Sequence, residues 1–251
     1  MGEFSSFDGT TIVFDDLGEG PPVVMLHGFA ADARANWHQP KVVEAVVASG
    51  RRAITPDARG HGRSGKPHDV AAYKDNAMPR DVSALLDHLD LEQVDLVGYS
   101  MGGRVTALVA SRESRVRSIV LGGVGVGVVQ GGGLPGRDAI ADALTAADPA
   151  GIGSARARAF RQFAESTGAD REALAAVMRA GIGADANPVG AISVPALVIC
   201  GDRDDLVGDS SLLAQAIPGA EHVIVNGDHL TAVGDPKFRQ AIADFLSRVA
   251  R

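Results

Sequence analysis

Short apolar runs alternate with helically spaced apolar residues along most of the chain. Runs bounded by turn residues are typical of buried strands, and we predict such strands at residues 23–26, 52–55, 94–97, 117–121, 194–200 and 221–225. Apolar residues at helical spacing predict helices at residues 42–47, 82–89, 105–109, 212–217 and 238–249. The turn signal Asp8-Gly9, between residues 4–7 and 11–15, indicates an antiparallel hairpin. This alternation predicts an α/β fold with a mostly parallel central sheet and helices on both faces.

The pattern changes over residues 122–193. Residues 122–136 are rich in glycine and show neither helical nor strand periodicity. They lack the third glycine of G-x-G-x-x-G, which argues against a dinucleotide site. Alanine and arginine, which favour helices, dominate residues 139–146, 155–167 and 171–180. We therefore interpret residues 131–193 as a small helical cap, inserted in a core domain made of residues 1–130 and 194–251.

Composition and charge narrow the function classes. A chain of 251 residues is long enough for one α/β domain with an insertion. The net charge of −7 argues against nucleic-acid binding, which needs a basic face. The single cysteine, Cys200, excludes an internal disulfide framework. We see no signal peptide and no apolar run approaching the ~20 residues of a membrane span, so we expect a cytoplasmic protein without membrane association.

The stretch at residues 94–103, VDLVGYSMGG, carries the strongest chemical signal. It places G-x-S-x-G between a predicted strand and a predicted helix, which is the context of a nucleophile elbow. Gly98 and Gly102 have no Cβ, so the strand and the helix can approach closely. Ser100 is then exposed at the carboxyl end of the sheet, and the Met101 backbone N–H can help to bind an oxyanion. The alternative is a glycine-rich turn with an idle serine.

Five segments, in this order, resemble motifs of the α/β-hydrolase fold superfamily. They are LHGF at 26–29, DARGHGRS at 57–64, GYSMGG at 98–103, GDRD at 201–204 and GDH at 227–229. The resemblance covers nearly the whole chain, and the cap matches loosely. It implies an α/β-hydrolase fold and a serine esterase-like activity. Likeness of fold alone does not identify the substrate.

A serine hydroxyl becomes a strong nucleophile only when an adjacent base takes its proton. We assign Ser100 as the nucleophile, His229 as the base and Asp204 as the carboxylate that orients the histidine. Their order along the chain is the Ser–Asp–His order of this fold. Asp202 and Asp205 lie in the same loop, and the G-x-x-D spacing favours Asp204 over both.

The resemblance of residues 26–29 to an oxyanion loop implies a second donor beside Met101. We expect the backbone N–H groups of Phe29 and Met101 to form the oxyanion hole. His27 and Gly28 immediately precede one donor, and Tyr99 precedes the nucleophile. We expect these three residues to contact the substrate.

Other charged residues in or near the motifs have expected roles outside the triad. We interpret Asp57 and Arg59 as organising their loop, whereas Arg104 suits surface exposure and substrate contact equally well. Asp228 takes the place of the small residue that usually precedes the histidine in this superfamily. If its carboxylate faces the His229 ring, it favours the charged imidazolium and moves the acidic limb of the pH–rate profile upward. The alternative is that Asp228 faces solvent.

These residues predict a serine carboxylesterase that acts on esters of small to medium acyl size through an acyl-enzyme on Ser100. We expect no cofactor and no metal, because no metal-ligand cluster stands out. The expected partner is a small-molecule ester or lactone, and the oligomeric state stays open. Lactonase, C–C bond hydrolase, perhydrolase and cofactor-free lyase or synthase activities can use the same triad, and a non-catalytic receptor is a further alternative. Serine at the elbow argues against epoxide hydrolase chemistry, which uses aspartate there.

Overall fold

The computed structural model describes residues 1–129, 134, 136–183 and 187–249. Within this part of the chain the strands form an eight-stranded sheet in the order β1-β2-β4-β3-β5-β6-β7-β8. The β1–β2 and β2–β4 pairs are antiparallel, and the other pairs are parallel. This confirms the predicted α/β fold and the hairpin at the N-terminus. The strands are β1 (Gly2–Ser5), β2 (Thr11–Leu17), β3 (Pro22–Leu26), β4 (Arg52–Pro56), β5 (Val94–Tyr99), β6 (Val116–Gly122), β7 (Ala196–Gly201) and β8 (Glu221–Val225).

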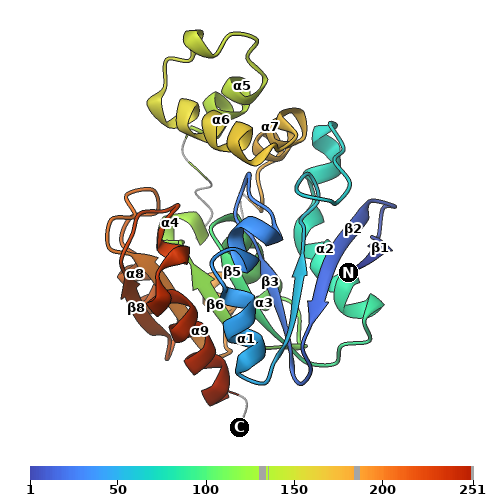
Figure 1. Cartoon of the computed structure of the whole chain (residues 1–251), viewed down its shortest axis with the longest axis vertical. Coiled ribbons are helices and arrows are strands. Elements are labelled where there is room, and N and C mark those ends of the chain that lie inside the picture. The colour runs from blue at the N-terminus through green and yellow to red at the C-terminus, as the bar shows by residue number, and fades with distance from the viewer. Residues whose placement is uncertain (130–133, 135, 184–186, 250–251) are drawn as a thin grey trace.

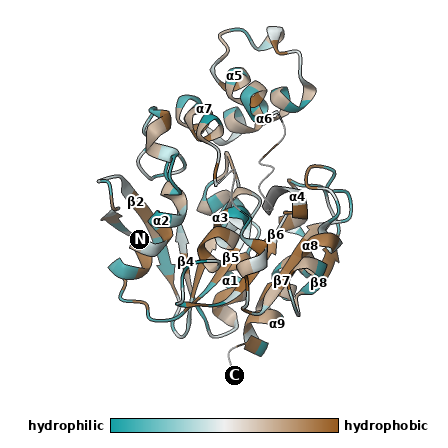
Figure 2. Ribbon diagram, turned by 180° about the vertical axis from the view of Figure 1, so that it is seen from behind, coloured by the Kyte–Doolittle hydropathy of each residue, from teal (hydrophilic) through white to brown (hydrophobic). Residues whose placement is uncertain are grey.

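Helices cover both faces of the sheet, as predicted (Figure 1). Successive side chains of a strand point to opposite faces, so Val24 of β3 packs in one apolar core and Val23 packs in the other. Figure 2 shows the central strands as mostly hydrophobic, which fits parallel strands buried on both sides. One face packs against α1 (Val42–Ala48) and α9 (Pro236–Val249), and the other packs against α2 (Ala77–His88), α3 (Met101–Ala110) and α8 (Ser210–Ala216).

Three helices between β6 and β7 form a separate layer beyond the carboxyl ends of the parallel strands (top of Figure 1). They are α5 (Arg137–Thr145), α6 (Ala155–Thr167) and α7 (Arg171–Ala180), and we call them the α5–α7 layer. Ser154 and Asp170 cap the N-termini of α6 and α7 with their side chains. Gly168 ends α6 in the left-handed conformation that glycine tolerates best. The bounds of α6 and α7 are those predicted from composition.

Some elements were not predicted. The glycine-rich segment at residues 122–136, expected to be irregular, contains the short helix α4 (Val126–Val129); residues 130–133 and 135 lie outside the described residues. Helix α2 begins at Ala77, five residues before the predicted start at residue 82, because Pro79 is tolerated within a first helical turn. The π-helical turn η1 (Arg34–His38) and the 3₁₀ turns were also missed: η2 (Val70–Tyr73), η3 (Pro149–Gly151), η4 (Val189–Ala191) and η5 (Ala232–Gly234).

A helix that spans a membrane needs about 20 predominantly apolar residues. Among the helices in the described residues, none combines enough length with enough apolar character to cross a membrane.

Candidate active site

The turn between β5 and α3 holds Ser100 in a strained backbone conformation. Its φ of 53° and ψ of −111° lie outside the regions that most residues adopt. A Cβ at Gly98 would overlap the Gly102 carbonyl and the Thr106 hydroxyl. A Cβ at Gly102 would overlap the Leu26 carbonyl of β3. The two glycines therefore permit the close approach of strand and helix that the elbow needs.

Ser100, His229 and Asp204 form a continuous chain of hydrogen bonds. Ser100 Oγ lies 2.8 Å from His229 Nε2, and His229 Nδ1 lies 2.8 Å from Asp204 Oδ2. The Asp204 side chain is fully buried, and its other oxygen accepts a hydrogen bond from the Leu206 N–H at 3.2 Å. Because a carboxylate can only accept, Nδ1 carries the imidazole proton and Nε2 is free to accept the serine proton.

The acid loop contains three aspartates, of which only Asp204 reaches the histidine. Asp202 accepts a hydrogen bond from the Gly227 N–H at 2.8 Å, and Asp205 is exposed. Asp204 also receives a long contact of 3.8 Å from the Cys200 thiol. Burial, together with the nearby Asp204 carboxylate, raises the pKa of Cys200 to about 11. The thiol therefore stays protonated at neutral pH.

The Asp228 carboxylate is hydrogen-bonded within the turn that carries His229. Its carboxylate accepts hydrogen bonds from the Leu230 N–H and the Thr231 N–H, at 3.0 and 2.9 Å, and from the Thr231 hydroxyl at 2.7 Å. These bonds, first among them that of the Thr231 side chain, lower the pKa of Asp228. The residue is exposed and caps the turn that carries the histidine. These contacts favour the solvent-facing alternative, and the absence of an effect on the imidazolium stays a prediction.

A turn at residues 28–31 lies directly against the nucleophile. A Cβ built on Gly28 would be 3.5 Å from Ser100 Cβ. The Ala31 N–H closes the turn on the Gly28 carbonyl at 3.3 Å, and the Gly28 N–H donates to Asn36 Oδ1 at 2.8 Å. Asn36 is buried and comes from η1, an irregular element without a sequence signal. Sequence reasoning missed this residue for that reason.

Across from this turn, Met101 is the first residue of α3. Its N–H therefore lies outside the hydrogen-bond ladder of the helix. Phe29 and Met101, the two expected oxyanion donors, line one cavity together with Ser100. The structure thus brings the two expected donors and the serine together.

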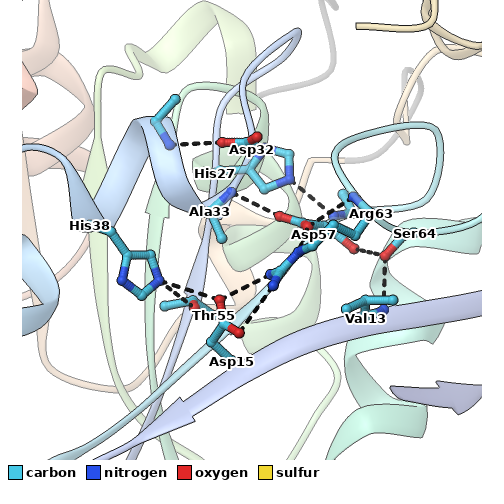
Figure 3. Close-up of polar contacts among 12 residues, drawn as sticks. Val13, Asp15, His27, Asp32, Ala33, His38, Thr55, Asp57, Arg63 and Ser64 are labelled. Carbon is cyan, nitrogen blue, oxygen red and sulfur yellow. Dashed lines mark hydrogen bonds and ion pairs between the residues drawn. The ribbon is translucent and has the colours of Figure 1, made fainter. Parts of the chain in front are cut away.

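His27 does not line either of the cavities at Ser100, which corrects the expectation that it contacts the substrate. It is 1 % exposed, and both ring nitrogens bind backbone atoms. Nδ1 donates to the Gly28 carbonyl at 2.8 Å, and Nε2 accepts from the Ala58 N–H at 2.9 Å. Burial lowers the pKa of His27 and lowers that of His61 beside it to about 3, so both rings are neutral. The imidazole therefore ties the end of β3 to the loop that follows β4 (Figure 3).

That loop is organised by Asp57 and Arg59, as predicted. Figure 3 shows Asp57 receiving hydrogen bonds from the Ala33 N–H at 2.9 Å and from the Arg63 guanidinium at 2.7 Å. Arg59 is buried and donates to Asp81 at 2.6 Å through both Nε and Nη2. This bidentate pair accounts for the buried position of Asp81 within α2.

Two cavities meet at Ser100. The larger encloses about 450 Å³ and the smaller about 100 Å³, and both are lined by Phe29, Ser100, Phe160 and Leu206. Gly28 and Tyr99 line the larger cavity, as expected for substrate contact. The Tyr99 hydroxyl also donates to the His229 carbonyl at 2.7 Å. Burial and the Asp204 carboxylate raise the pKa of Tyr99, so its hydroxyl remains a donor.

Arg104 lines the smaller cavity and is buried rather than on the surface. Its guanidinium donates to the carbonyl groups of Ile182 and Gly183, at the end of the α5–α7 layer. Burial lowers the pKa of Arg104. The other side chains around this cavity are mostly apolar, including Met101, Val124, Leu134, Val177, Met178 and Val207.

Among the described residues, no group of three or more His, Cys, Asp or Glu side chains is arranged to hold a metal ion. The groups that surround the serine are the His229 imidazole, a buried carboxylate and backbone N–H groups. Such a set can activate a hydroxyl and stabilise a negative oxygen.

Comparisons with known proteins agree with the fold. A family model described as alpha/beta hydrolase fold matches residues 21–130. The chain is 30% identical over 275 residues to the non-heme chloroperoxidase CPO-A1 of Kitasatospora aureofaciens, covering 96% of this chain and 98% of that protein. It is 40% identical over 111 residues to the 2-hydroxymuconate semialdehyde hydrolase of Pseudomonas sp. (strain CF600), covering 43% of this chain and 38% of that protein. It is also similar to the enol-lactonase from Burkholderia xenovorans LB400, with a TM-score of 0.72, 26% identity, and coverage of 98% of this chain and 100% of that chain.

Proposed function

The chain belongs to the α/β-hydrolase fold family, and from this premise we propose that it is a serine hydrolase that cleaves carboxylic esters of small to medium acyl size. One observation carries the proposal: the hydrogen-bond chain from Ser100 through His229 to Asp204, with both links at 2.8 Å. It supplies a nucleophile, a base and an orienting carboxylate in the geometry that acyl transfer requires.

In the proposed reaction, Ser100 Oγ attacks the ester carbonyl carbon while His229 Nε2 takes the serine proton. The buried Asp204 carboxylate stabilises the imidazolium that forms. The Phe29 and Met101 N–H groups hold the oxyanion of the tetrahedral intermediate. The imidazolium then protonates the leaving alcohol as the C–O bond breaks, which leaves the acyl group on Ser100. Water repeats the sequence on the acyl-enzyme, releases the acid and returns the proton to the serine.

We also propose that residues 131–193 act as a cap that closes the substrate site. Support comes from α6, which supplies Phe160, Phe163 and Thr167 to the lining of the larger cavity. The smaller cavity, of about 100 Å³, favours a short group on one side of the scissile bond. The larger, of about 450 Å³, admits a bulkier group on the other side.

Lactone hydrolysis is a second candidate, because it needs the same steps on a cyclic ester. The observation that favours it is the similarity to the enol-lactonase over nearly the full length of both chains. Peracid formation, with hydrogen peroxide replacing water in deacylation, and C–C bond cleavage are further uses of the same groups. Relatives named as a chloroperoxidase and as a semialdehyde hydrolase make both worth including in the assay.

The first prediction tests the nucleophile. Ser100→Ala should lower ester turnover by about 10⁴ or more, because the residues of a triad act as a unit, and should leave folding nearly unchanged. A serine-reactive phosphonate should label Ser100 in the wild-type protein. The matched control is Ser111→Ala, at the other end of α3, whose hydroxyl donates to the Leu108 carbonyl of its own helix.

The substrate panel should contain p-nitrophenyl esters of increasing acyl length, lactones, a vinylogous diketone, and an ester with hydrogen peroxide. Full activity in Ser100→Ala would overturn the proposal. Selective turnover of lactones would favour the second candidate.

A further inference from the structure

The turn at residues 28–31, which carries the proposed oxyanion donor Phe29, is bound from two sides. From the core, Asn36 Oδ1 accepts the Gly28 N–H at 2.8 Å. From the cap, the Thr167 hydroxyl donates to the Ala30 carbonyl at 2.8 Å. Thr167 is the last residue of α6, far from this turn in the sequence. A cap side chain therefore binds the backbone next to the proposed oxyanion hole.

The backbone of this turn needs external support. Ala30 occupies its third position with a φ of 59°, in the left-handed region. Glycine is the usual residue at that position of a turn, because a Cβ makes the conformation unfavourable. The left-handed conformation of Ala30 is therefore one that contacts from outside the turn have to stabilise. The hydrogen bond from the Thr167 hydroxyl to the Ala30 carbonyl is such a contact.

A second contact between α6 and the turn acts on Phe29 itself. The Phe160 ring packs edge-on against the Phe29 ring, with 5.9 Å between the centroids. Phe160 lies two helical turns before Thr167, so both residues project from the same face of α6. The Thr167 hydroxyl also lies 3.1 Å from the Ala164 carbonyl and 3.3 Å from that of Phe163, and its shortest contact is the one to Ala30.

We propose that Thr167 is a positioning residue, whose hydroxyl holds the 28–31 turn so that the Phe29 N–H faces the developing oxyanion. The inference rests on the proposed function, since it assigns the turn to oxyanion binding. It makes the completeness of the oxyanion hole depend on the docking of α6. Because Phe160 and Thr167 also line the larger cavity, a substrate that contacts α6 influences the same turn.

The test uses Thr167→Val, which keeps the shape of the side chain and removes the hydroxyl. Removing one such hydrogen bond should lower kcat about three- to tenfold and leave KM within about twofold, because the oxyanion forms only in the transition state. Thr167→Ser should restore kcat. The matched control is Thr145→Val at the end of α5, where the hydroxyl binds the carbonyls of Ala141 and Asp142 in its own helix.

A second readout does not depend on turnover. Amide hydrogen exchange in a peptide covering residues 28–31 should be faster in Thr167→Val than in the wild type, and unchanged in Thr145→Val. Ala30→Gly should reduce the effect of Thr167→Val on kcat to less than half of its fold-change, because glycine adopts the turn unaided.

The outcomes separate the two proposals. A wild-type protein without turnover or phosphonate labelling overturns the proposed function, while hydrogen exchange still decides whether Thr167 holds the turn. Turnover in the wild type, with kcat and exchange in Thr167→Val equal to those of Thr145→Val, overturns the positioning role alone. An increase in KM with unchanged kcat also overturns it, because Thr167 would then contribute only to substrate binding.

Discussion

At the residue scale, His229 is held at three points. Asp204 binds Nδ1, Ser100 binds Nε2, and the Tyr99 hydroxyl binds the carbonyl group of the same residue. The Tyr99 ring also lies beside the imidazole, with 5.6 Å between the centroids. The ring and the backbone of the histidine are thus oriented by different partners. Replacing any one of these three partners should therefore change the orientation of His229 without removing the imidazole that acts as the base.

The second prediction concerns the carboxylate. Asp204→Asn should lower ester kcat by about 10⁴, because an amide no longer fixes the tautomer or stabilises the imidazolium. Asp205→Asn is the matched control, since that neighbouring side chain is exposed, and it should retain near-wild-type kcat. Steady-state kinetics on one p-nitrophenyl ester compares them. A dead Asp205→Asn variant beside an active Asp204→Asn variant would show that the acid has been misassigned.

The third prediction follows from the solvent-facing position of Asp228. Asp228→Asn removes a charge that is exposed to solvent and hydrogen-bonded within its own turn, so the acidic limb of kcat/KM against pH should stay at its wild-type position. Hydrogen bonds from Thr231 lower the pKa of Asp228 in the folded state. Its contribution to stability is therefore present above its unfolded pKa and is lost as pH falls through the lowered value. A limb that moves to lower pH in Asp228→Asn would mean that the carboxylate acts on the ring after all.

Sequence motifs identified the residues whose chemistry depends on their spacing along the chain. They did not indicate the residues whose role depends on where the side chain points in the folded protein. The strand-end positions of Ser100 and His229 follow from the pattern of strands, so their proximity could be expected. The inward burial of His27 could not, because the same motif is compatible with a ring on either side of the chain. Asn36 and Thr167 carry no motif, and only the folded chain places them on the 28–31 turn.

At the element scale, strands were predicted well because their apolar runs are bounded by turn residues. β8 has the predicted bounds, and β7 begins two residues later than predicted, after Pro195. Short elements were not predicted, because they lack such a pattern. η1 and α4 each span too few residues to show a period, and their positions depend on tertiary contacts.

The fourth prediction concerns the contact between β3 and α3. Gly102→Ala should destabilise the protein by about 3 kcal/mol or more, because the new Cβ would overlap a backbone carbonyl that cannot move away. Gly127→Ala in α4 is the control: within the described part of the chain its Cβ would meet no atom closer than 4 Å, so it should change stability by less than about 1 kcal/mol. Urea unfolding measures both. Equal stability of the two variants would mean that β3 and α3 can separate without cost.

At the scale of the whole molecule, the α5–α7 layer is joined to the core at distinct places. Thr167 binds the 28–31 turn, and Arg104 binds the chain after α7. A third contact lies at the start of α7, where His68 of the core binds Asp170 at 3.0 Å and Glu172 at 2.9 Å. Asp170 also caps α7, so this contact attaches the beginning of the helix to the core. Of these three junctions, the third contains a histidine, whose charge changes in the physiological pH range.

The last prediction is that the His68 junction weakens as pH rises. The hydrogen bond with Asp170, followed by the charges of Asp170 and Glu172, raises the pKa of His68 above its ordinary value. A histidine whose pKa is raised by folding contributes stability that is fully present below its unfolded pKa, near ~6.5, and that is lost as pH passes through the raised value. The loss of stability caused by His68→Gln should therefore be larger at pH 5.5 than at pH 9.

Urea unfolding of both proteins at the two pH values measures this difference directly, and salt should reduce it because the three side chains are partly exposed. His222→Gln is the matched control. That histidine is also exposed, but it binds the Ser210 hydroxyl within the core instead of a carboxylate of the α5–α7 layer. If the His68→Gln difference is constant with pH, or grows as pH rises, the charged imidazole does not hold α7 to the core. The junction would then depend on the neutral ring, and docking of the α5–α7 layer would be insensitive to pH in this range.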